Sequence, residues 1–289
     1  MSSAAYHEWA DQAALLVVRN LPQALFVVLV AVVLGLILKD ALNGATRRTF
    51  LNPDKWQPLT LVDIKNLSHN TRRYRFALPH QEQLLGLPLG QHISIKGVDE
   101  GGREVMRPYT PTSEIHQRGH VDFVIKLYDD GQMSQVLASL DVGAVLLFKG
   151  PKGRFRYERG SKKAIGMIAG GSGITPMYQV AQEILRDPND TTSLSLIYAN
   201  VNEDDILLRQ ELDQLAETHS NFSVYYVLNN PPKGWQGGKG FVTADMIKKN
   251  LPAPGTDVLV LRCGPGPMNR AMEAHMDALG YTNGQQFQF

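Results

Sequence analysis

Ala164-Ile165-Gly166-Met167-Ile168-Ala169 leads directly into Gly170-Gly171-Ser172-Gly173-Ile174-Thr175-Pro176-Met177, and this stretch decides the fold. The first part is a short apolar run, as expected of a strand. The glycines allow a tight turn and a close approach of the backbone to a ligand. Thr175 suits the N-cap of a helix, and Pro176 suits its first position. The stretch therefore predicts a strand, a turn and a helix whose free N–H groups can bind an anion.

Strand, turn and helix alternate through the rest of the C-terminal half. The expected strands are 164–169, 193–199, 222–228 and 258–263, and the expected helices are 176–186, 207–218 and 268–279. Such alternation predicts a parallel sheet covered by helices. Ligands of these sheets bind beyond the carboxyl ends of the strands, so functional residues are expected at that edge.

A second motif, Cys263-Gly264-Pro265-Gly266-Pro267-Met268, follows the last of these strands and precedes a helix. Its backbone can line a flat heteroaromatic ring, with the Cys263 thiol beside a reacting carbon. The alternative is a buried structural thiol in a Gly/Pro turn. The position at the expected ligand edge favours a functional site.

Short alternating runs dominate the region before residue 160. They predict strands at 59–64, 71–78, 92–96, 121–128 and 144–149, and one helix at 133–140. Gly, Pro, Asp and Asn separate these runs at spacings typical of a small antiparallel barrel.

Arg107-Pro108-Tyr109-Thr110-Pro111-Thr112-Ser113 lies between two of these runs, and its prolines keep the chain extended at a strand end. The arginine fork fits phosphate oxygens, and tyrosine offers a flat ring. The segment suits a ligand with a pyrophosphate and an aromatic ring system; the alternative is a proline-rich turn with a solvated arginine.

Gly131-Gln132-Met133-Ser134 precedes the expected helix of the first region. Free N–H groups and the Ser134 hydroxyl at a helix start can form a second anion site. A simple capped turn is the alternative.

Length and charge exclude several classes of protein. With 289 residues the chain can form two domains, and its net charge of +1 gives no indication of nucleic-acid binding. The single cysteine, Cys263, excludes an internal disulfide and fits a reducing compartment. No Cys/His cluster has the spacing of a metal site.

Residues 21–38 carry no charge and are mostly apolar. As a helix of about 1.5 Å per residue, this segment would nearly span a bilayer core. Lys39, Arg47, Arg48 and Lys55 follow it, while Arg19 alone among Lys and Arg precedes it, so the C-terminal part is expected in the cytosol. A cleaved signal peptide and a buried core helix are the alternatives, but residues 1–18 lack the positive start of a signal peptide.

The motifs together resemble those of the NADH–cytochrome b5 reductases. Arg107-Pro-Tyr-Thr, Gly131-x-Met-Ser, Gly170-Gly-x-Gly-Ile-Thr-Pro-Met and Cys263-Gly-Pro-x-Pro-Met occur in that family's order and spacing. The resemblance extends over 58–289 and includes Asp205-Ile-Leu-Leu-Arg. The N-terminal anchor and Leu228-Asn-Asn-Pro-Pro resemble the fungal members most.

The resemblance implies a two-domain β + α/β protein. An antiparallel Greek-key FAD-binding barrel is expected over 58–160 and a parallel-sheet α/β NADH-binding domain over 161–289. An N-terminal segment (1–20), a transmembrane helix (21–38) and a tether (39–57) are expected before them.

The same resemblance assigns roles to individual residues. Near the reacting atoms it places His92, Thr110 and Cys263, with His92 and Thr110 assisting proton movement. Cofactor contacts in the first domain are assigned to Arg107, Pro108, Tyr109, Thr110, Val124, Lys126, Gln132, Met133 and Ser134. Those in the second domain are assigned to Gly170, Gly171, Ser172, Gly173, Thr175, Pro176, Asn229, Cys263, Gly264, Pro265, Met268 and Phe289.

Two positions depart from the animal members of the family. They have Lys where this chain has Gln132, so this chain lacks one positive charge that could pair with a phosphate. They have Asp where this chain has Asn229. An Asp there would repel the extra phosphate of NADPH, so Asn229 leaves an NADPH-preferring reductase for another acceptor as an alternative. A non-catalytic flavin-binding membrane protein is a further alternative.

The resemblance implies cytochrome b5 as the acceptor of single electrons from FAD, after hydride transfer from NADH. In fungal relatives it also implies the iron protein of diphthamide synthesis. A basic run between the domains could steer an acidic haem protein, or it could be an ordinary solvated loop. This run comprises Lys149, Lys152, Arg154, Arg156, Arg159, Lys162 and Lys163. The mitochondrial outer membrane and the endoplasmic reticulum are both expected locations.

Overall fold

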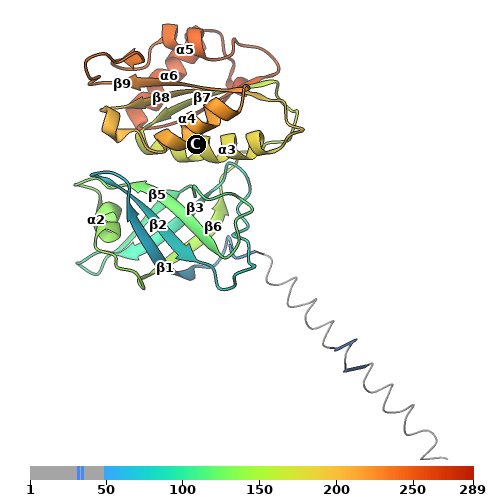
Figure 1. Cartoon of the computed structure of the whole chain (residues 1–289), viewed down its shortest axis with the longest axis vertical. Helices are drawn as coiled ribbons and strands as arrows, with labels where there is room; N and C mark the ends of the chain where they lie inside the picture. The colour runs from blue at the N-terminus through green and yellow to red at the C-terminus, as the bar shows by residue number, and fades with distance from the viewer. Residues whose placement is uncertain (1–30, 33, 36–48) are drawn as a thin grey trace, which may run out of the picture. The chain divides into compact units, whose positions relative to one another are not determined.

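The computed structural model describes residues 31–32, 34–35 and 49–289, and Thr49–Phe289 form one compact unit (Figure 1). The predicted N-terminal segment and most of the predicted membrane span therefore lie outside the described residues. Within the described part of the chain, no helix has both the length and the apolar character needed to cross a membrane.

The first half of the compact unit is a six-stranded antiparallel sheet. Its strands are β1 (Gln57–Asn66), β2 (Thr71–Ala77), β3 (His92–Val98), β4 (Glu104–Tyr109), β5 (His120–Lys126) and β6 (Val145–Lys152). They lie in the order β4-β3-β6-β1-β2-β5, so β6 returns to pair with the first strand, as in a Greek key. Helix α2 (Gln132–Ala138) follows β5.

Alternation along these strands creates the core of the antiparallel sheet. Tyr74 and Phe76 on β2 and Phe148 on β6 are fully buried. The rings of Phe76 and Phe148 meet edge to face with centroids 4.9 Å apart. Edge-to-face contact is a favoured arrangement of aromatic rings, so it adds to the stabilisation from burial.

The second half is a six-stranded parallel sheet in the order β10-β9-β8-β7-β11-β12. The strands are β7 (Ala164–Gly170), β8 (Ser193–Asn200), β9 (Phe222–Leu228), β10 (Gly238–Lys239), β11 (Val258–Cys263) and β12 (Gln286–Gln288). The helices are α3 (Ile174–Arg186), α4 (Arg209–Thr218), α5 (Ala244–Asn250) and α6 (Gly266–Ala278). Side chains of α3 and α4 share a core on one face of the sheet, and those of α5 and α6 share another (Figure 1). The predicted order of an antiparallel sheet and then a parallel α/β sheet is confirmed.

The two sheets share part of their core. Val124 of β5 and Phe155, which follows β6, belong to the same buried cluster as residues of α3 and β8. The backbone N–H of Gly90 donates to the Gln179 side chain on α3 at 2.8 Å. Apolar packing and polar contacts therefore both join the antiparallel half to the parallel half.

The start of α3 differs from the prediction. A 3₁₀ turn over Gly171–Gly173 leads into α3, which begins at Ile174, so Gly173 is its N-cap and Thr175 is already helical. The Thr175 hydroxyl donates to the Ser172 carbonyl oxygen at 3.3 Å. The N-cap prediction for Thr175 and the first-position prediction for Pro176 were wrong because the 3₁₀ turn starts the helical conformation earlier.

The last part of the predicted tether belongs to the compact unit. The Phe50 N–H donates to the Leu84 carbonyl oxygen at 2.9 Å, and the Phe50 side chain is buried in the core of the antiparallel sheet. The alternation pattern also missed β4, α5 and the short strands β10 and β12. Two- and three-residue strands are too short to produce a period-2 pattern.

Candidate active site

The two glycine-rich turns meet at the carboxyl edge of the parallel sheet. β7 and β11 are neighbours, with Ala169 paired to Cys263. A Cβ atom on Gly173 would lie 2.2 Å from the Cys263 carbonyl oxygen, and one on Gly170 would lie 2.4 Å from Met268 Sδ. Only glycine fits at Gly173, where the neighbouring atoms are backbone, whereas a side chain at Gly170 would require Met268 to move. The two turns are therefore in direct backbone contact at Gly173 and Cys263.

The second turn has its own internal support. Asn269 on α6 donates to the Gly264 carbonyl oxygen at 2.8 Å, and Pro265 is the N-cap of α6. A Cβ on Gly264 would come within 2.9 Å of Met268 Sδ. The Met268 side chain therefore packs against Gly170 of the first turn and Gly264 of the second. This packing limits how much of the Met268 side chain can contact a ligand.

Two tyrosine hydroxyls, those of Tyr128 and Tyr198, form hydrogen bonds with the first turn. The buried Tyr198 of β8 donates its hydroxyl hydrogen to the Gly171 carbonyl oxygen at 3.0 Å. The Tyr128 hydroxyl, from the antiparallel half, lies 3.3 Å from Ser172 Oγ. Gly171 has φ +53°, a left-handed conformation that favours glycine. Through Tyr128, the antiparallel half therefore directly contacts the glycine-rich turn that precedes α3 in the parallel half.

The Arg107 segment ends strand β4, as the proline pattern predicted. Arg107 is exposed, and in the described part of the chain its guanidinium bonds to one group, the Met106 carbonyl oxygen at 2.8 Å. Tyr109 is half-buried, its ring centroid lies 6.5 Å from that of Phe123, and burial raises its pKa. Pro108 is exposed and Thr110 is half-buried. The guanidinium is thus available to a ligand while the phenol is fixed by packing.

His92 and Thr110 are brought to neighbouring positions by the pairing of β3 and β4. Ile93 pairs with Tyr109 in the antiparallel register, so the next position outward aligns His92 with Thr110. Burial and the nearby Lys152 charge lower the pKa of His92. The imidazole is therefore neutral at pH 7 and can both accept and donate a proton.

The Gln132–Ser134 turn is partly structural. Met133 is buried in the core of the antiparallel sheet, so only its backbone is available to a ligand. Ser134 Oγ accepts a hydrogen bond from the Tyr128 N–H at 3.0 Å, and Gln132 is exposed. The Ser134 hydroxyl still has its own hydrogen to donate.

The Cys263 thiol is a neutral group at physiological pH. It is half-buried, and burial raises its pKa to about 11. Because the thiolate is the nucleophilic form, this environment does not suit covalent catalysis. A neutral thiol beside a reacting atom can still pack and donate a weak hydrogen bond.

The remaining predicted contacts are distributed around this edge. Val124 is buried against the parallel half, and Lys126 forms an ion pair with Asp205. Asn229 is exposed after β9 and donates its N–H to the Asn200 carbonyl oxygen at 3.0 Å. The half-buried Phe289 ring lies 5.4 Å from Phe155.

Asn200, the last residue of β8, was missed by the sequence reasoning. It is buried, and both amide atoms of its side chain lack a hydrogen-bond partner among the described residues. Leaving such a group unpaired costs about 1–3 kcal/mol. A polar residue that ends a strand at the ligand edge of a parallel sheet was the available signal.

These residues fit a flavin nucleotide and a nicotinamide nucleotide. The exposed Arg107 guanidinium suits a pyrophosphate, and the turn Gly171–Gly173 places the start of α3, whose first N–H groups can bind an anion, at the carboxyl edge of the parallel sheet. The unpaired Asn200 amide at the same edge offers both a donor and an acceptor.

Comparison with protein families agrees with this fit. Residues 58–157 match the oxidoreductase FAD-binding domain, and residues 167–274 match the oxidoreductase NAD-binding domain. The fold and the site thus define a flavin- and nicotinamide-dependent oxidoreductase.

Relatives with assigned names narrow the class further. The chain is 47% identical over 250 residues to NADH-cytochrome b5 reductase 1 of Dictyostelium discoideum, covering 86% of this chain and 87% of the relative. It is 50% identical to NADH--cytochrome b5 reductase 1 of Arabidopsis thaliana, covering 86% and 88%. For NADH-cytochrome b5 reductase 1 of Aspergillus oryzae the identity is 47%, covering 91% and 93%. The chain belongs to the NADH–cytochrome b5 reductase family, so it is an NADH-dependent FAD oxidoreductase.

Solved structures share the arrangement. The cytochrome b5 reductase domain of Ulva prolifera nitrate reductase matches with TM-score 0.80 and 39% identity, covering 83% of this chain and 100% of that domain. The CS-b5R domains of human Ncb5or, in an NAD+ form, match with TM-score 0.72 and 25% identity, covering 81% and 69%. The predicted family and both predicted cofactors are confirmed.

Proposed function

We propose that this enzyme delivers the electrons of NADH singly to cytochrome b5. The observation that carries the proposal is the contact between the two halves at the glycine surface, where Tyr128 of the antiparallel half meets Ser172. A bound flavin accepts two electrons as hydride and releases them one at a time. The relatives' names, NADH-cytochrome b5 reductase, support cytochrome b5 as the acceptor.

The chain's own residues supply binding, orientation and a proton route in this proposal. Arg107 binds the FAD pyrophosphate, while Tyr109 and Thr110 orient the ring end of the cofactor. Neutral His92, aligned with Thr110, exchanges a proton with solvent. Asn200 hydrogen-bonds the nicotinamide nucleotide at the edge of the parallel sheet.

Part of the basic run remains available for an acidic partner. Arg159 pairs with Asp187 and Lys163 with Asp257, each at 2.9 Å, whereas Arg154 and Arg156 are exposed. Exposed charges accelerate encounter with an oppositely charged protein, and salt screens this effect. We therefore assign steering of cytochrome b5 to Arg154 and Arg156.

The test uses the purified, flavin-containing protein without oxygen. NADH should bleach the yellow flavin, and oxidised cytochrome b5 added afterwards should be reduced with a rate that falls as salt rises. The Arg154→Ala/Arg156→Ala double variant should lower the cytochrome rate and its salt dependence without changing bleaching by NADH. Bleaching without any transfer to cytochrome b5 would refute the acceptor.

An NADPH-dependent reaction is the second candidate, because Asn229 carries no negative charge to repel a 2′-phosphate. Flavin reduction should be faster with NADH, and Asn229→Asp should widen the difference by lowering the NADPH rate. A wild-type preference for NADPH of about tenfold would overturn the assignment of NADH as the physiological donor.

We also propose that residues 21–38 anchor the enzyme with its catalytic part in the cytosol, in the mitochondrial outer membrane or the endoplasmic reticulum. The uncharged composition of the segment and the basic residues after it support this. An anchor would confine the enzyme and a membrane-bound acceptor to one surface. Fractionation of the full-length chain and of one lacking residues 1–48 tests the anchor, since only the former should pellet with membranes.

The iron protein of diphthamide synthesis is a further acceptor suggested by the resemblance to fungal members. Anaerobic incubation of that protein with NADH and the enzyme should reduce its iron. No reduction above a control without enzyme would exclude this acceptor.

A further inference from the structure

A buried ion pair joins the two halves of the compact unit. Lys126 Nζ, at the end of β5, lies 2.7 Å from Asp205 Oδ1, at the end of the 3₁₀ turn that follows β8. The two side chains are 12% and 7% exposed. Because β5 belongs to the antiparallel sheet and β8 to the parallel sheet, the pair connects the flavin-binding half to the nucleotide-binding half.

The two oxygens of the Asp205 carboxylate bond to different halves. Oδ1 accepts from Lys126 and from Asn70 Nδ2 at 3.3 Å, both in the antiparallel half. Oδ2 accepts from the backbone N–H of Asn202 at 3.1 Å and from its side chain at 3.0 Å, within the parallel half. Burial alone would raise the pKa of Asp205, but the bonds from Lys126 and Asn70 outweigh it and lower the pKa to about 2. The carboxylate is therefore charged throughout the working pH range.

The ion pair is part of a row of contacts along β5 and the residues after it. Val124, Lys126 and Tyr128 alternate in sequence, and each contacts the parallel half: Val124 packs in its core, Lys126 bonds Asp205 and Tyr128 meets Ser172. Alternate residues of a strand point to the same side. Lys126 lies in the middle of this row, between the shared core and the glycine turn.

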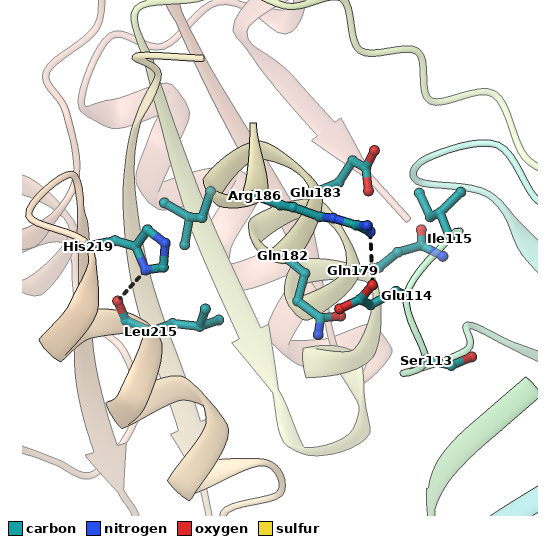
Figure 2. Close-up of a pocket in the computed structure, with 10 residues that line it drawn as sticks. Ser113, Glu114, Ile115, Gln179, Gln182, Glu183, Arg186, Leu215 and His219 are labelled. Atoms are coloured by element: carbon teal, nitrogen blue, oxygen red, sulfur yellow. Dashed lines mark hydrogen bonds and ion pairs between the residues drawn. The ribbon is translucent and has the colours of Figure 1, made fainter. Parts of the chain in front are cut away.

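Two other contacts between titratable side chains of the two halves lie nearer the surface. Arg186 on α3 bonds Glu114 at 2.8 Å, with the side chains 50% and 54% exposed (Figure 2). His116 lies 3.1 Å from Glu183, also near the surface. Exposed pairs contribute little, whereas breaking a buried pair leaves an uncompensated charge. The exposed Arg186–Glu114 pair is therefore a matched control for the buried one.

We propose that Asp205 is a positioning residue that holds β5 and the glycine turn of the nucleotide-binding half in the register required for hydride transfer. The inference rests on the assignment of FAD to the antiparallel half and NADH to the parallel half. Each half retains its own cofactor contacts when the pair is broken, but the two cofactors lose their fixed separation. Misplacement by about 1 Å costs about 100-fold in rate, so the effect falls on the rate and not on affinity.

The experiment compares Asp205→Asn with Glu114→Gln by rapid mixing of the flavin-containing enzymes with NADH without oxygen. In Asp205→Asn the limiting rate of flavin bleaching should fall about 10- to 100-fold. Its flavin content, absorption spectrum and NADH dissociation constant should stay within about threefold. Glu114→Gln should match the wild type. A normal limiting rate in Asp205→Asn, or a loss confined to NADH affinity, would overturn the proposal.

A double-variant cycle tests whether Asp205 acts through Lys126. Lys126→Met should slow bleaching, and adding Asp205→Asn should cause little further loss, because the same contact is already broken. Fully multiplicative losses would show that Asp205 acts by another route and would refute the proposal. Asn70→Ala, which removes only the longer bond to Oδ1, should slow bleaching by a smaller factor and provides the test if Asp205→Asn does not fold.

A readout without bound cofactor separates positioning from chemistry. Hydrogen exchange in the flavin-free protein should increase at Leu127, whose N–H bonds the Asn70 carbonyl oxygen, and at Asn202 in Asp205→Asn but not in Glu114→Gln. Unchanged exchange at both positions would contradict the proposed contact. Failure of NADH to bleach the wild-type flavin would instead refute the function, so the two failures are distinguishable. The assay uses no cytochrome b5 and does not depend on the acceptor.

Discussion

Gly173 lies against the backbone of Cys263 so closely that a Cβ on Gly173 would come within 2.2 Å of the Cys263 carbonyl oxygen. The two residues are 90 positions apart in the sequence, yet each belongs to a glycine-rich turn at the end of a neighbouring strand. The contact is between backbone atoms, which cannot rotate away as a side chain can. This closeness joins the two turns into one surface at the carboxyl edge of the parallel sheet.

Gly173→Ala should therefore impair the reaction with NADH. The added methyl group must push the two turns apart, so the NADH dissociation constant should rise about tenfold or more, while FAD remains bound in the antiparallel half. Gly255→Ala is the control, because its Cβ would meet Val258 Cγ2 at 3.7 Å and the Ala253 carbonyl oxygen at 3.9 Å, both ordinary van der Waals distances. Titration of both variants with NADH, monitored by flavin absorbance, checks the prediction; equal affinities would contradict it.

Arg107→Ala should release FAD. The guanidinium is exposed and is assigned to the pyrophosphate, and a charge-assisted hydrogen bond contributes about 1.5–3 kcal/mol, or about 10- to 100-fold in affinity. Arg103→Ala, on the same hairpin but paired with Asp99, should retain the cofactor. The ratio of flavin to protein absorbance after purification measures the effect. Full flavin occupancy in Arg107→Ala would refute the role of Arg107.

Asn200→Ala should weaken NADH binding without destabilising the protein. Its buried amide has no partner among the described residues, so the substitution removes a contact with the ligand but no internal bond. We expect a two- to tenfold rise in the dissociation constant, from about 0.5–1.5 kcal/mol. Asn221→Ala should instead lower the stability of the protein and leave NADH binding unchanged, because Asn221 Nδ2 donates to the Thr192 carbonyl oxygen at 3.0 Å. A lower free energy of unfolding for Asn200→Ala, with unchanged NADH binding, would contradict the assignment.

The contribution of Asp205 to stability should depend on pH. The folded protein lowers its pKa from 3.8 to about 2, so the stabilisation is present above pH 4 and is lost as the pH falls through about 2. The shift corresponds to about 2 kcal/mol. Urea unfolding of wild type and Asp205→Asn should therefore differ most near neutral pH and progressively less between pH 5 and pH 3. A difference independent of pH would show that the carboxylate charge is not its source.

Cys263 should react slowly with alkylating reagents. With its pKa raised from 9.0 to about 11, its thiolate fraction at pH 8 is about 100-fold lower than that of an unperturbed thiol. Iodoacetamide labelling of the folded and the urea-unfolded protein, followed by mass spectrometry, measures this difference. NADH should slow labelling further if the thiol lies beside the nucleotide; labelling of the folded protein at the unfolded rate would contradict the raised pKa.

Much of the fold followed from the pattern of the sequence. The strands 222–228 and 258–263 were predicted to the residue, and every other predicted strand agrees within three residues at each end. Alternating or continuous apolar runs mark strands that bury one face or both. The start of α3 was wrong because a 3₁₀ turn over Gly171–Gly173 precedes it. Strand β12 was missed because three residues are too few to show an alternating pattern. In the structure the Arg262 guanidinium of β11 donates to the Gln286 side chain of β12 at 2.7 Å.

The sequence by itself determined the two halves, their order, the glycine turns and the Arg107 segment, because these depend on local conformation and on residue type. Only the tertiary structure decided that Gly173 lies against Cys263, that the buried Asn200 amide has no hydrogen-bond partner among residues 49–289, and that Asp205 bonds Lys126. These relationships join residues far apart in the chain, and no local pattern specifies which distant side chain will meet a given carboxylate or carbonyl group. They arise from the pairing of β7 with β11 and from the packing of β5 against the parallel half.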